Sequence, residues 1–272
     1  MSSEIFQGLP AHRITLANGD TVLVAEQGAQ VLSWVSAGRE RLYLSPGNAF
    51  DGQAAMRGGV PVCFPQFNQR GDLPKHGFVR NMPWILQPSH DPAVLILRLS
   101  NSQATHKIWP VGFEVQLTVT LTPKNLRITL DAHNTGTEPW SFTGALHSYF
   151  AVDDIQRISL EGLGGQAEWD ALTDVHSRGA DQIHIHNEFD RVYQAPTQTM
   201  RLHDGAHTLQ ISQSASWANT VVWNPGPHKA LGDMPKGDHA KMLCVEAAQV
   251  FEPITVPAGG RWQGWQHLQA TA

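Results

Sequence analysis

The chain has 272 residues, of which 41% are hydrophobic and 16% are charged, and this globular composition excludes an intrinsically disordered protein. Its 19 Lys and Arg residues against 24 Asp and Glu residues give a net charge of −5, which argues against nucleic acid as the main partner. A small anionic ligand held by a few local cations remains compatible with this charge balance.

The sequence predicts neither membrane association nor export. No segment approaches the length of uncharged apolar sequence that a spanning helix needs, and the N-terminus lacks the pattern of a signal peptide. The two cysteines, Cys63 and Cys244, are too few for a disulfide scaffold, and neither belongs to a CxxC motif. We therefore expect a cytoplasmic protein in a reducing compartment.

Alternation of apolar and polar residues predicts β-strands along most of the chain. In chain order, strands are expected at residues 12–16, 21–26, 31–36, 94–100, 113–122, 126–132, 208–213 and 221–223. The alternation is clearest at 113–122 and resumes after Pro123-Lys124-Asn125, which predicts an antiparallel hairpin. Turn signals such as Asn18-Gly19-Asp20 separate other strands.

Helical periodicity is absent, since no window of about 15 residues shows a convincing apolar stripe. With 24 glycines and 17 prolines as punctuation, the sequence predicts an all-β fold, built from two large packed sheets. No internal repeat, low-complexity tract or linker divides the chain. We expect residues 1–272 to form a single β-sandwich domain.

Residues 56–67 interrupt the regular strand pattern. Arg57 stands directly before the pair Gly58-Gly59, and prolines alternate with apolar residues after it. Glycines and prolines of this kind suit an irregular extended path that approaches another group closely. The segment therefore presents Arg57 at an unusual stretch of backbone.

Residues 74–80 form a second irregular segment and carry Lys75, His76 and Arg80. An arginine offers a planar fork of donors and a lysine offers a point charge, so the cluster suits an anion such as a phosphate. A solvated basic turn is the alternative explanation, and the spacing alone does not decide between them.

A lone carboxylate, Glu246, interrupts the apolar run of residues 243–250. A strand that is apolar at both odd and even positions is usually buried on both faces. Burial of a carboxylate is costly unless the group is paired or hydrogen-bonded, and it raises the pKa toward a value useful for proton transfer. Glu246 is therefore a candidate catalytic group, with a structural ion pair or a position at the edge of a cleft as alternatives.

His147 is the candidate partner of that carboxylate. Counting along residues 143–150 places it opposite Phe142 and Leu146 and on the same side as Tyr149. A histidine on the second face of a largely apolar strand is often a satisfied structural residue, so the pattern leaves both roles open. Asp190 offers a further carboxylate at the start of a short strand.

Several segments occur in an order that is typical of one family. They are Arg57-Gly58-Gly59-Val60-Pro61 with Phe64-Pro65, His76-Gly77-Phe78-Val79-Arg80-Asn81, Leu146-His147-Ser148-Tyr149-Phe150, Asp190-Arg191-Val192-Tyr193, Trp223-Asn224-Pro225 and Val245-Glu246. The chain from about Leu16 to Trp265 resembles the hexose-6-phosphate mutarotases, or glucose-6-phosphate 1-epimerases, of the aldose 1-epimerase superfamily. The ordered set is specific, whereas any single tripeptide in it is weak.

The resemblance implies a galactose-mutarotase-like supersandwich of large antiparallel sheets, with the active site in a cleft on one sheet. It implies that His147 is the catalytic acid and Glu246 the catalytic base. Arg57 and Arg80 match positions that hold the substrate and its phosphate. Asp190 matches a position that hydrogen-bonds sugar hydroxyls.

The same resemblance suggests the remaining site residues and the partners. Lys75 stands where some members carry glutamine, and its charge makes it a plausible phosphate ligand. His76 belongs to the same motif and is expected to line the site. The implied partner is a small-molecule sugar phosphate, and no metal or other cofactor is implied. We expect a monomer.

The implied reaction interconverts the α and β anomers of a hexose 6-phosphate such as glucose 6-phosphate. The anomeric hydroxyl loses a proton while the ring oxygen gains one, so that the C1–O5 bond breaks and can close again on the other carbonyl face. A carboxylate base and an imidazolium acid meet that need. Proximity of the two groups would raise the pKa of His147 and lower that of Glu246, against the effect of burial.

Two other functions compete with this interpretation. His184 and His186 share one face of a strand and suggest a cupin-like metal enzyme, although the nearby carboxylates are poorly spaced as further ligands. Alternatively, a non-catalytic carbohydrate-binding module could use some of the nine tryptophans as stacking platforms. Trp262 and Trp265 could lie in the core or in the cleft, and the core is the favoured interpretation.

Overall fold

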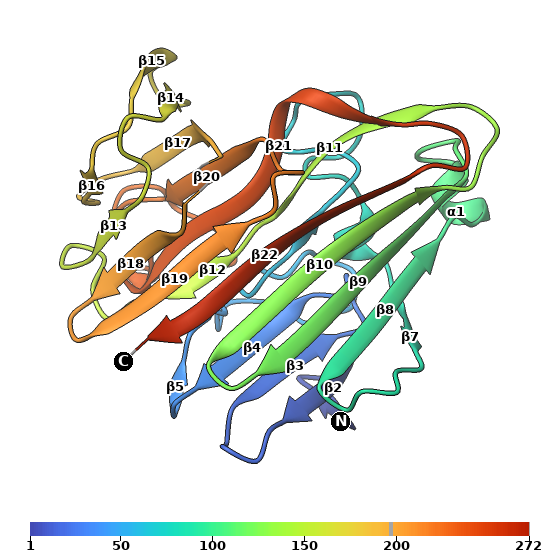
Figure 1. Ribbon diagram of the computed structural model, residues 1–272, viewed down its shortest axis with the longest axis horizontal. Helices are drawn as coiled ribbons and strands as arrows, with labels where there is room; N and C mark the ends of the chain where they lie inside the picture. Colours follow the sequence, from blue (N-terminus) through green and yellow to red (C-terminus); the bar gives the residue numbers. More distant parts are fainter. Residues whose placement is uncertain (196–197, 272) are drawn as a thin grey trace.

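The computed structural model describes residues 1–195 and 198–271, and antiparallel β-strands dominate the architecture (Figure 1). Within these ranges the strands form three sheets, of five, nine and eight strands. The helical segments are single turns: α1 (Gln103–His106), η1 (Val79–Asn81) and η2 (Asp238–Lys241). No helix in the described part of the chain is long and apolar enough to cross a membrane.

The five-stranded sheet is a meander in which each strand pairs with the next one in sequence. Its strands are β1 (Ser2–Phe6), β2 (Leu9–Thr15), β3 (Thr21–Ala25), β4 (Val31–Ser36) and β5 (Arg39–Glu40). The two large sheets that the sequence predicts are present, with nine and eight strands, and this smaller sheet is a third one that the sequence did not predict. Alternation decides which side chains of a strand face the core, but it does not decide which strand pairs with which, and the short turns here favour local hairpins.

The nine-stranded sheet contains the expected hairpin, in which Leu117 lies opposite Leu130. In spatial order its strands are β16 (Gln182–Ile183), β13 (Ser159–Glu161), β18 (Met200–Asp204), β19 (His207–Gln213), β22 (Arg261–Thr271), β10 (Asn125–Asn134), β9 (Phe113–Thr122), β8 (Val94–Ser100) and β7 (Ile85–Gln87). Apolar side chains of β9 and β10 are fully buried, so the period-2 pattern was a reliable guide here. The expected bounds of 31–36, 94–100 and 113–122 are confirmed.

The eight-stranded sheet carries the candidate site. Its strands are β15 (Val175–Arg178), β14 (Ala167–Asp170), β17 (Phe189–Gln194), β20 (Asn219–Asn224), β21 (Met242–Val256), β11 (Trp140–Leu146) and β6 (Val62–Cys63), with β12 (Tyr149–Ala151) also paired to β21. One large apolar cluster joins this sheet to the other two. Figure 1 shows β21 running between β20 and β11 in the middle of the sheet.

Strand β21 is buried on both faces along residues 242–250, as its apolar run predicts. Leu243, Val245 and Ala247 join the sandwich interior, whereas Cys244 and Ala248 belong to smaller apolar clusters. By the alternation of a strand, Glu246 lies on the same face as Cys244 and Ala248, away from the interior. A carboxylate is thus held at the centre of a sheet.

The C-terminal tryptophans separate between the two faces of β22. Trp262 packs against the main core, as expected. Trp265 is half-buried, with the Arg127 guanidinium 4.1 Å from its ring centroid, so its placement in the core was wrong. Their odd spacing of three residues puts the two rings on opposite faces of one strand.

Candidate active site

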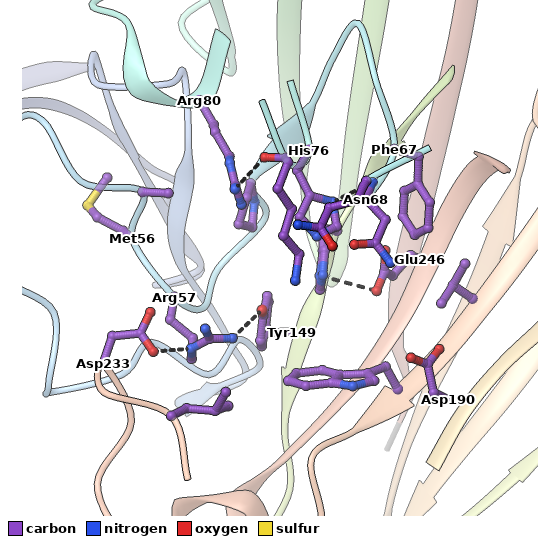
Figure 2. Close-up of a pocket in the computed structure, with 18 of the residues that line it drawn as sticks. Met56, Arg57, Phe67, Asn68, His76, Arg80, Tyr149, Asp190, Asp233 and Glu246 are labelled. Carbon is purple, nitrogen blue, oxygen red and sulfur yellow. Dashed lines mark hydrogen bonds and ion pairs between the residues drawn. The ribbon is translucent and has the colours of Figure 1, made fainter. Parts of the chain in front are cut away.

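A cavity of about 430 Å³ lies on the outer face of the eight-stranded sheet (Figure 2). Strands β17, β20 and β21 contribute to it, as do the β11–β12 junction and the loops at 55–80 and 225–233. All seven residues proposed for the site line this cavity: Arg57, Lys75, His76, Arg80, His147, Asp190 and Glu246. Residues from five separate parts of the sequence therefore meet at one place.

Glu246 and His147 lie in direct contact at the floor of the cavity. His147 Nδ1 is 3.2 Å from Glu246 Oε1, and their side chains are 11% and 1% exposed. Although this is an ion-pair distance, the angles do not suit a hydrogen bond, and neither Nδ1 nor Glu246 Oε2 has a hydrogen-bond partner among the described residues. Two unsatisfied buried atoms at a cavity floor indicate groups kept available for a ligand.

Burial dominates the protonation of this pair. It lowers the pKa of His147 to about 3, with Arg80 and Arg57 adding to the effect, and it raises the pKa of Glu246 well above the ordinary value, with Asp190 as a further cause. The rise in the pKa of His147 and the fall in the pKa of Glu246 that proximity alone would cause are therefore outweighed. In a dry site the cost of solvating charge outweighs the attraction between two partners.

His147 is oriented by its neighbours at the turn between β11 and β12. Its backbone N–H donates to the Pro61 carbonyl at 3.0 Å, and its ring stacks on Tyr149 with centroids 4.8 Å apart and planes 9° apart. Trp223 packs edge-on against both rings. The imidazole is thus fixed by packing as well as by its main chain.

Arg57 occupies the rim of the cavity and is already engaged by two side chains. Its Nε donates to Asp233 Oδ1 at 2.6 Å and its Nη1 donates to the Tyr149 hydroxyl at 3.2 Å, as Figure 2 shows. The paired glycines after it explain the path of the chain, because a Cβ at Gly59 would lie 2.0 Å from the Val31 carbonyl oxygen. The close approach expected of this segment is therefore to the backbone of β4.

The segment with Lys75, His76 and Arg80 folds as a loop closed by its own hydrogen bonds. His76 has a φ of +63°, a left-handed conformation that costs a non-glycine residue free energy. Its N–H donates to the Asn68 carbonyl at 2.9 Å, and the Asn68 N–H donates to its Nδ1 at 3.2 Å. Its ring centroid lies 5.5 Å from that of His147.

Lys75 and Arg80, near the two ends of this loop, both line the cavity. Arg80 Nη2 donates to the Lys75 carbonyl at 2.9 Å, and the buried Arg80 Nε has no hydrogen-bond partner among the described residues. Lys75 is exposed. In Figure 2 Arg57 and Arg80 lie on one side of the cavity and Asp190 and Glu246 on the other. We call these the cationic side, where Asp233 pairs with Arg57, and the acidic side.

Asp190 lies on β17, directly opposite Trp223 of β20. Burial raises its pKa to about 6, while Lys229 opposes this and Glu188 adds to it. Lys229 lines the cavity and forms an ion pair with Glu188. Asp190 is thus a half-buried carboxylate that faces a pocket.

The sequence reasoning did not select several residues of the cavity. They are Phe67, Asn68, Tyr149, Trp223, Lys229 and Asp233. Tyr149 and Trp223 stood in the family segments but received no role. Asp233 and Lys229 lie in a Gly- and Pro-rich loop without periodicity, so no local signal links them to Arg57 or Asp190.

The histidine pair His184 and His186 does not form a metal site with other residues. His184 is exposed and its Nδ1 lies 3.1 Å from the Ile158 carbonyl oxygen, and neither histidine belongs to a cluster of potential ligands in the described residues. Both cysteines are free thiols, as expected. The cupin-like interpretation has no geometric support.

Comparison with known proteins identifies the family. The aldose 1-epimerase family model matches residues 12–269. A protein of Escherichia coli named "putative glucose-6-phosphate 1-epimerase" is 38% identical over 245 residues, covering 84% of this chain and 79% of the relative. One of the same name from Cenchrus ciliaris is 36% identical over 261 residues, covering 89% and 79%.

The fold agrees with this assignment. The crystal structure of a "putative mutarotase (YeaD)" from Salmonella typhimurium superimposes with a TM-score of 0.90 at 31% identity, covering 99% of this chain and 93% of the other. Galactose mutarotase-like proteins of more distant sequence share the fold, as one from Lactobacillus casei does with a TM-score of 0.78 at 15% identity. The supersandwich predicted from the sequence is thus confirmed. The chain belongs to the aldose 1-epimerase family and is an isomerase of the mutarotase type.

Proposed function

We propose that the protein interconverts the anomers of a hexose 6-phosphate, with glucose 6-phosphate as the first candidate substrate. The observation that carries the proposal is one cavity in which the His147–Glu246 contact lies beside Arg57, Lys75 and Arg80. Arg57 has Asp233 as its one acidic partner, and the buried Arg80 Nε has no hydrogen-bond partner among the described residues, so a phosphate dianion could bind these cations through further charge-assisted hydrogen bonds that a neutral sugar does not offer. The names of the relatives agree with this substrate class.

In this mechanism Glu246 accepts the proton of the anomeric hydroxyl and His147 donates one to the ring oxygen. Burial raises the pKa of Glu246 and lowers that of His147, so it favours the neutral form of both groups, a protonated carboxyl and an uncharged imidazole. The charged pair that the reaction uses has the same number of protons, and forming it requires a proton transfer between two groups that lie 3.2 Å apart without hydrogen-bond geometry. A substrate phosphate would favour that transfer, because it offsets the arginines that lower the pKa of His147.

Roles for the other residues follow from their positions. Arg57, Arg80 and Lys75 would hold the phosphate on the cationic side, and Asp190 would accept hydrogen bonds from sugar hydroxyls on the acidic side. His76 would line the space between them, next to the His147 ring. Since one apolar cluster draws on all three sheets, we also propose that the chain acts as one domain.

The proposal is tested by exchange NMR of anomer interconversion with the purified protein. Glucose 6-phosphate, galactose 6-phosphate and mannose 6-phosphate are compared with the corresponding free hexoses at equal concentration. We expect at least one phosphorylated sugar to exchange much faster than its free counterpart. Equal enhancement of glucose and glucose 6-phosphate would contradict the assigned substrate class, and binding without exchange would favour a carbohydrate-binding module.

A further inference from the structure

Cys244 adds a third potential metal ligand to the pair at the cavity floor. Its Sγ, a ring nitrogen of His147 and a carboxylate oxygen of Glu246 all lie within 4.8 Å of one another. The described residues contain no other group of three such side chains. Imidazole, thiolate and carboxylate are the ligand types that Zn²⁺ prefers.

The sheet holds the three groups together. Cys244 and Glu246 are two residues apart on β21 and so share a face. Cys244 pairs with Tyr149 of β12, two residues after His147, and this brings the β11–β12 turn over the same face. Cys244 and Glu246 are 0% and 1% exposed. The ligand set is therefore part of the folded sheet and does not depend on a mobile loop.

Two atoms of this group are buried without a partner. Glu246 Oε2 and His147 Nδ1 form no hydrogen bond with the described residues, although buried polar atoms in folded proteins are nearly always satisfied. Both side chains line the cavity, which gives an ion a path from solvent. These atoms point to a ligand that can accept more than one electron pair.

The geometry is close to that of a zinc site. Zn–N and Zn–O bonds of about 2.1 Å and Zn–S bonds of about 2.3 Å place tetrahedral ligand atoms roughly 3.4 to 3.7 Å apart. The His147 Nδ1–Glu246 Oε1 distance is 3.2 Å. Because Cys244 Sγ lies within 4.8 Å of its two partners, it has to move toward them by no more than about 1.4 Å to reach the tetrahedral spacing. A fourth position would face the cavity.

The charges of the ligands also permit Zn²⁺ to bind at this buried position. On binding, the S–H bond of Cys244 and the O–H bond of a protonated Glu246 break, Zn–S and Zn–O bonds form, and both protons pass to solvent. The thiolate, the carboxylate and Zn²⁺ then carry no net charge, so the nearby Arg57 and Arg80 are not opposed by a buried dication.

We propose that Zn²⁺ binds His147, Cys244 and Glu246 and thereby blocks the acid/base pair. The site would make the enzyme sensitive to a borderline-soft divalent cation, and a hard cation such as Mg²⁺ would not bind, because it prefers oxygen ligands. The binding part stands on the geometry alone, whereas the predicted inhibition rests on the proposed function.

Binding is measured first, by calorimetry with Zn²⁺ and by absorption spectroscopy with Co²⁺ as a probe of the ligands. The wild-type protein should bind one ion and show a thiolate-to-cobalt charge-transfer band. Cys244→Ser should lose the band and bind Zn²⁺ at least about 10-fold more weakly, because a ligand is removed. Cys63→Ser is the matched control, since Cys63 is also fully buried in this sheet but lies outside the ligand group.

Inhibition is measured next, as anomer exchange at buffered free Zn²⁺ relative to the metal-free rate of each variant. Wild type and Cys63→Ser should lose exchange as the ion binds, and neither should respond to Mg²⁺. Three results would overturn the proposal: the wild-type protein does not bind Zn²⁺ at ~100 µM, its Co²⁺ complex lacks the thiolate-to-cobalt band, or both Cys244→Ser and Cys244→Ala bind Zn²⁺ with unchanged affinity. Absence of exchange in the metal-free wild type would instead contradict the proposed function and leave the binding result standing.

Discussion

The floor and the rim of the cavity hold their functional groups in different ways. On the floor, Glu246 lies in the middle of β21, which is paired on both sides, and His147 lies at the adjoining turn. On the rim, Arg57 and Lys75 lie outside the regular strands, and Arg80 lies in the single turn η1. The floor is therefore rigid and dry, and the rim is more exposed.

This difference between floor and rim suits the two tasks proposed for them, proton transfer and phosphate binding. Proton transfer is sensitive to misplacement on the scale of 1 Å, and a strand at the centre of a sheet limits such displacement. Attraction between a phosphate and a cation falls only with the inverse of distance, so loops can supply it. We expect floor substitutions to act on kcat and rim substitutions to act on KM.

The largest effect is expected on the floor. Glu246→Gln keeps the size of the side chain and removes its basicity, so kcat should fall by about 100- to 10,000-fold with little change in KM. His147→Asn should lower kcat by a similar factor. Exchange NMR of anomer interconversion measures both variants. Near-normal exchange in both variants would show that the acid/base pair is assigned to the wrong residues.

A smaller effect is expected on the rim. Arg80→Ala removes a charge-assisted contact of about 1.5 to 3 kcal/mol, so KM should rise by about 10- to 150-fold while kcat is retained. Saturation kinetics with glucose 6-phosphate check this. Arg127→Ala, which removes a guanidinium stacked on Trp265 away from the cavity, is the matched control. A loss confined to kcat would place Arg80 with the floor residues.

The burial of the floor should also appear in the pH dependence of stability. Because burial lowers the pKa of His147 to about 3, from an ordinary value of 6.5, the unfolded chain binds more protons than the native protein between these pH values. The contribution of His147 to the free energy of unfolding should therefore fall with decreasing pH in this window, by up to about 1.4 kcal/mol per pH unit, while the raised pKa of Glu246 acts in the opposite direction. Urea denaturation between pH 7 and pH 4 measures the slope.

His147→Asn should make that slope shallower, because it removes the buried group that must stay neutral. His90→Asn serves as the control, since the side chain of His90 is exposed. An identical slope in His147→Asn and wild type would mean that the imidazole is charged in the native protein. The site would then contain an ion pair with Glu246 before substrate binds.

The smallest effect is expected from a residue that secures the rim from outside. The Arg70 guanidinium lies 4.9 and 5.0 Å from the ring centroids of Trp169 and Phe251, and its loop carries Asn68 and Lys75 to the cavity. Exposed cation–π contacts contribute about 0.5 to 1 kcal/mol each, so Arg70→Ala should raise KM by only a few-fold. Arg70→Lys should restore part of the loss, whereas a fall in kcat alone would contradict a positioning role.

Much of the scaffold could be predicted because it depends on local alternation. The strands at 31–36, 94–100 and 113–122 and the hairpin after 122 were predicted correctly, since burial of one face imposes a period of two on the sequence. The same reasoning recognised Glu246 as a carboxylate in a strand buried on both faces. Its role, and that of His147, came from the ordered family segments rather than from the alternation.

Sequence alone therefore determined the all-β class, the positions of the strands with clear alternation, the isolated buried carboxylate and the family. Only the tertiary structure decided that the N-terminal strands form a third sheet, that Asp233 pairs with Arg57, and that Cys244 lies beside His147 and Glu246. It also decided the direction in which the pKa values of His147 and Glu246 are shifted, because burial from every side outweighed the attraction between two neighbours. Alternation is a property of one strand, whereas partner choice and desolvation depend on segments far apart in the chain.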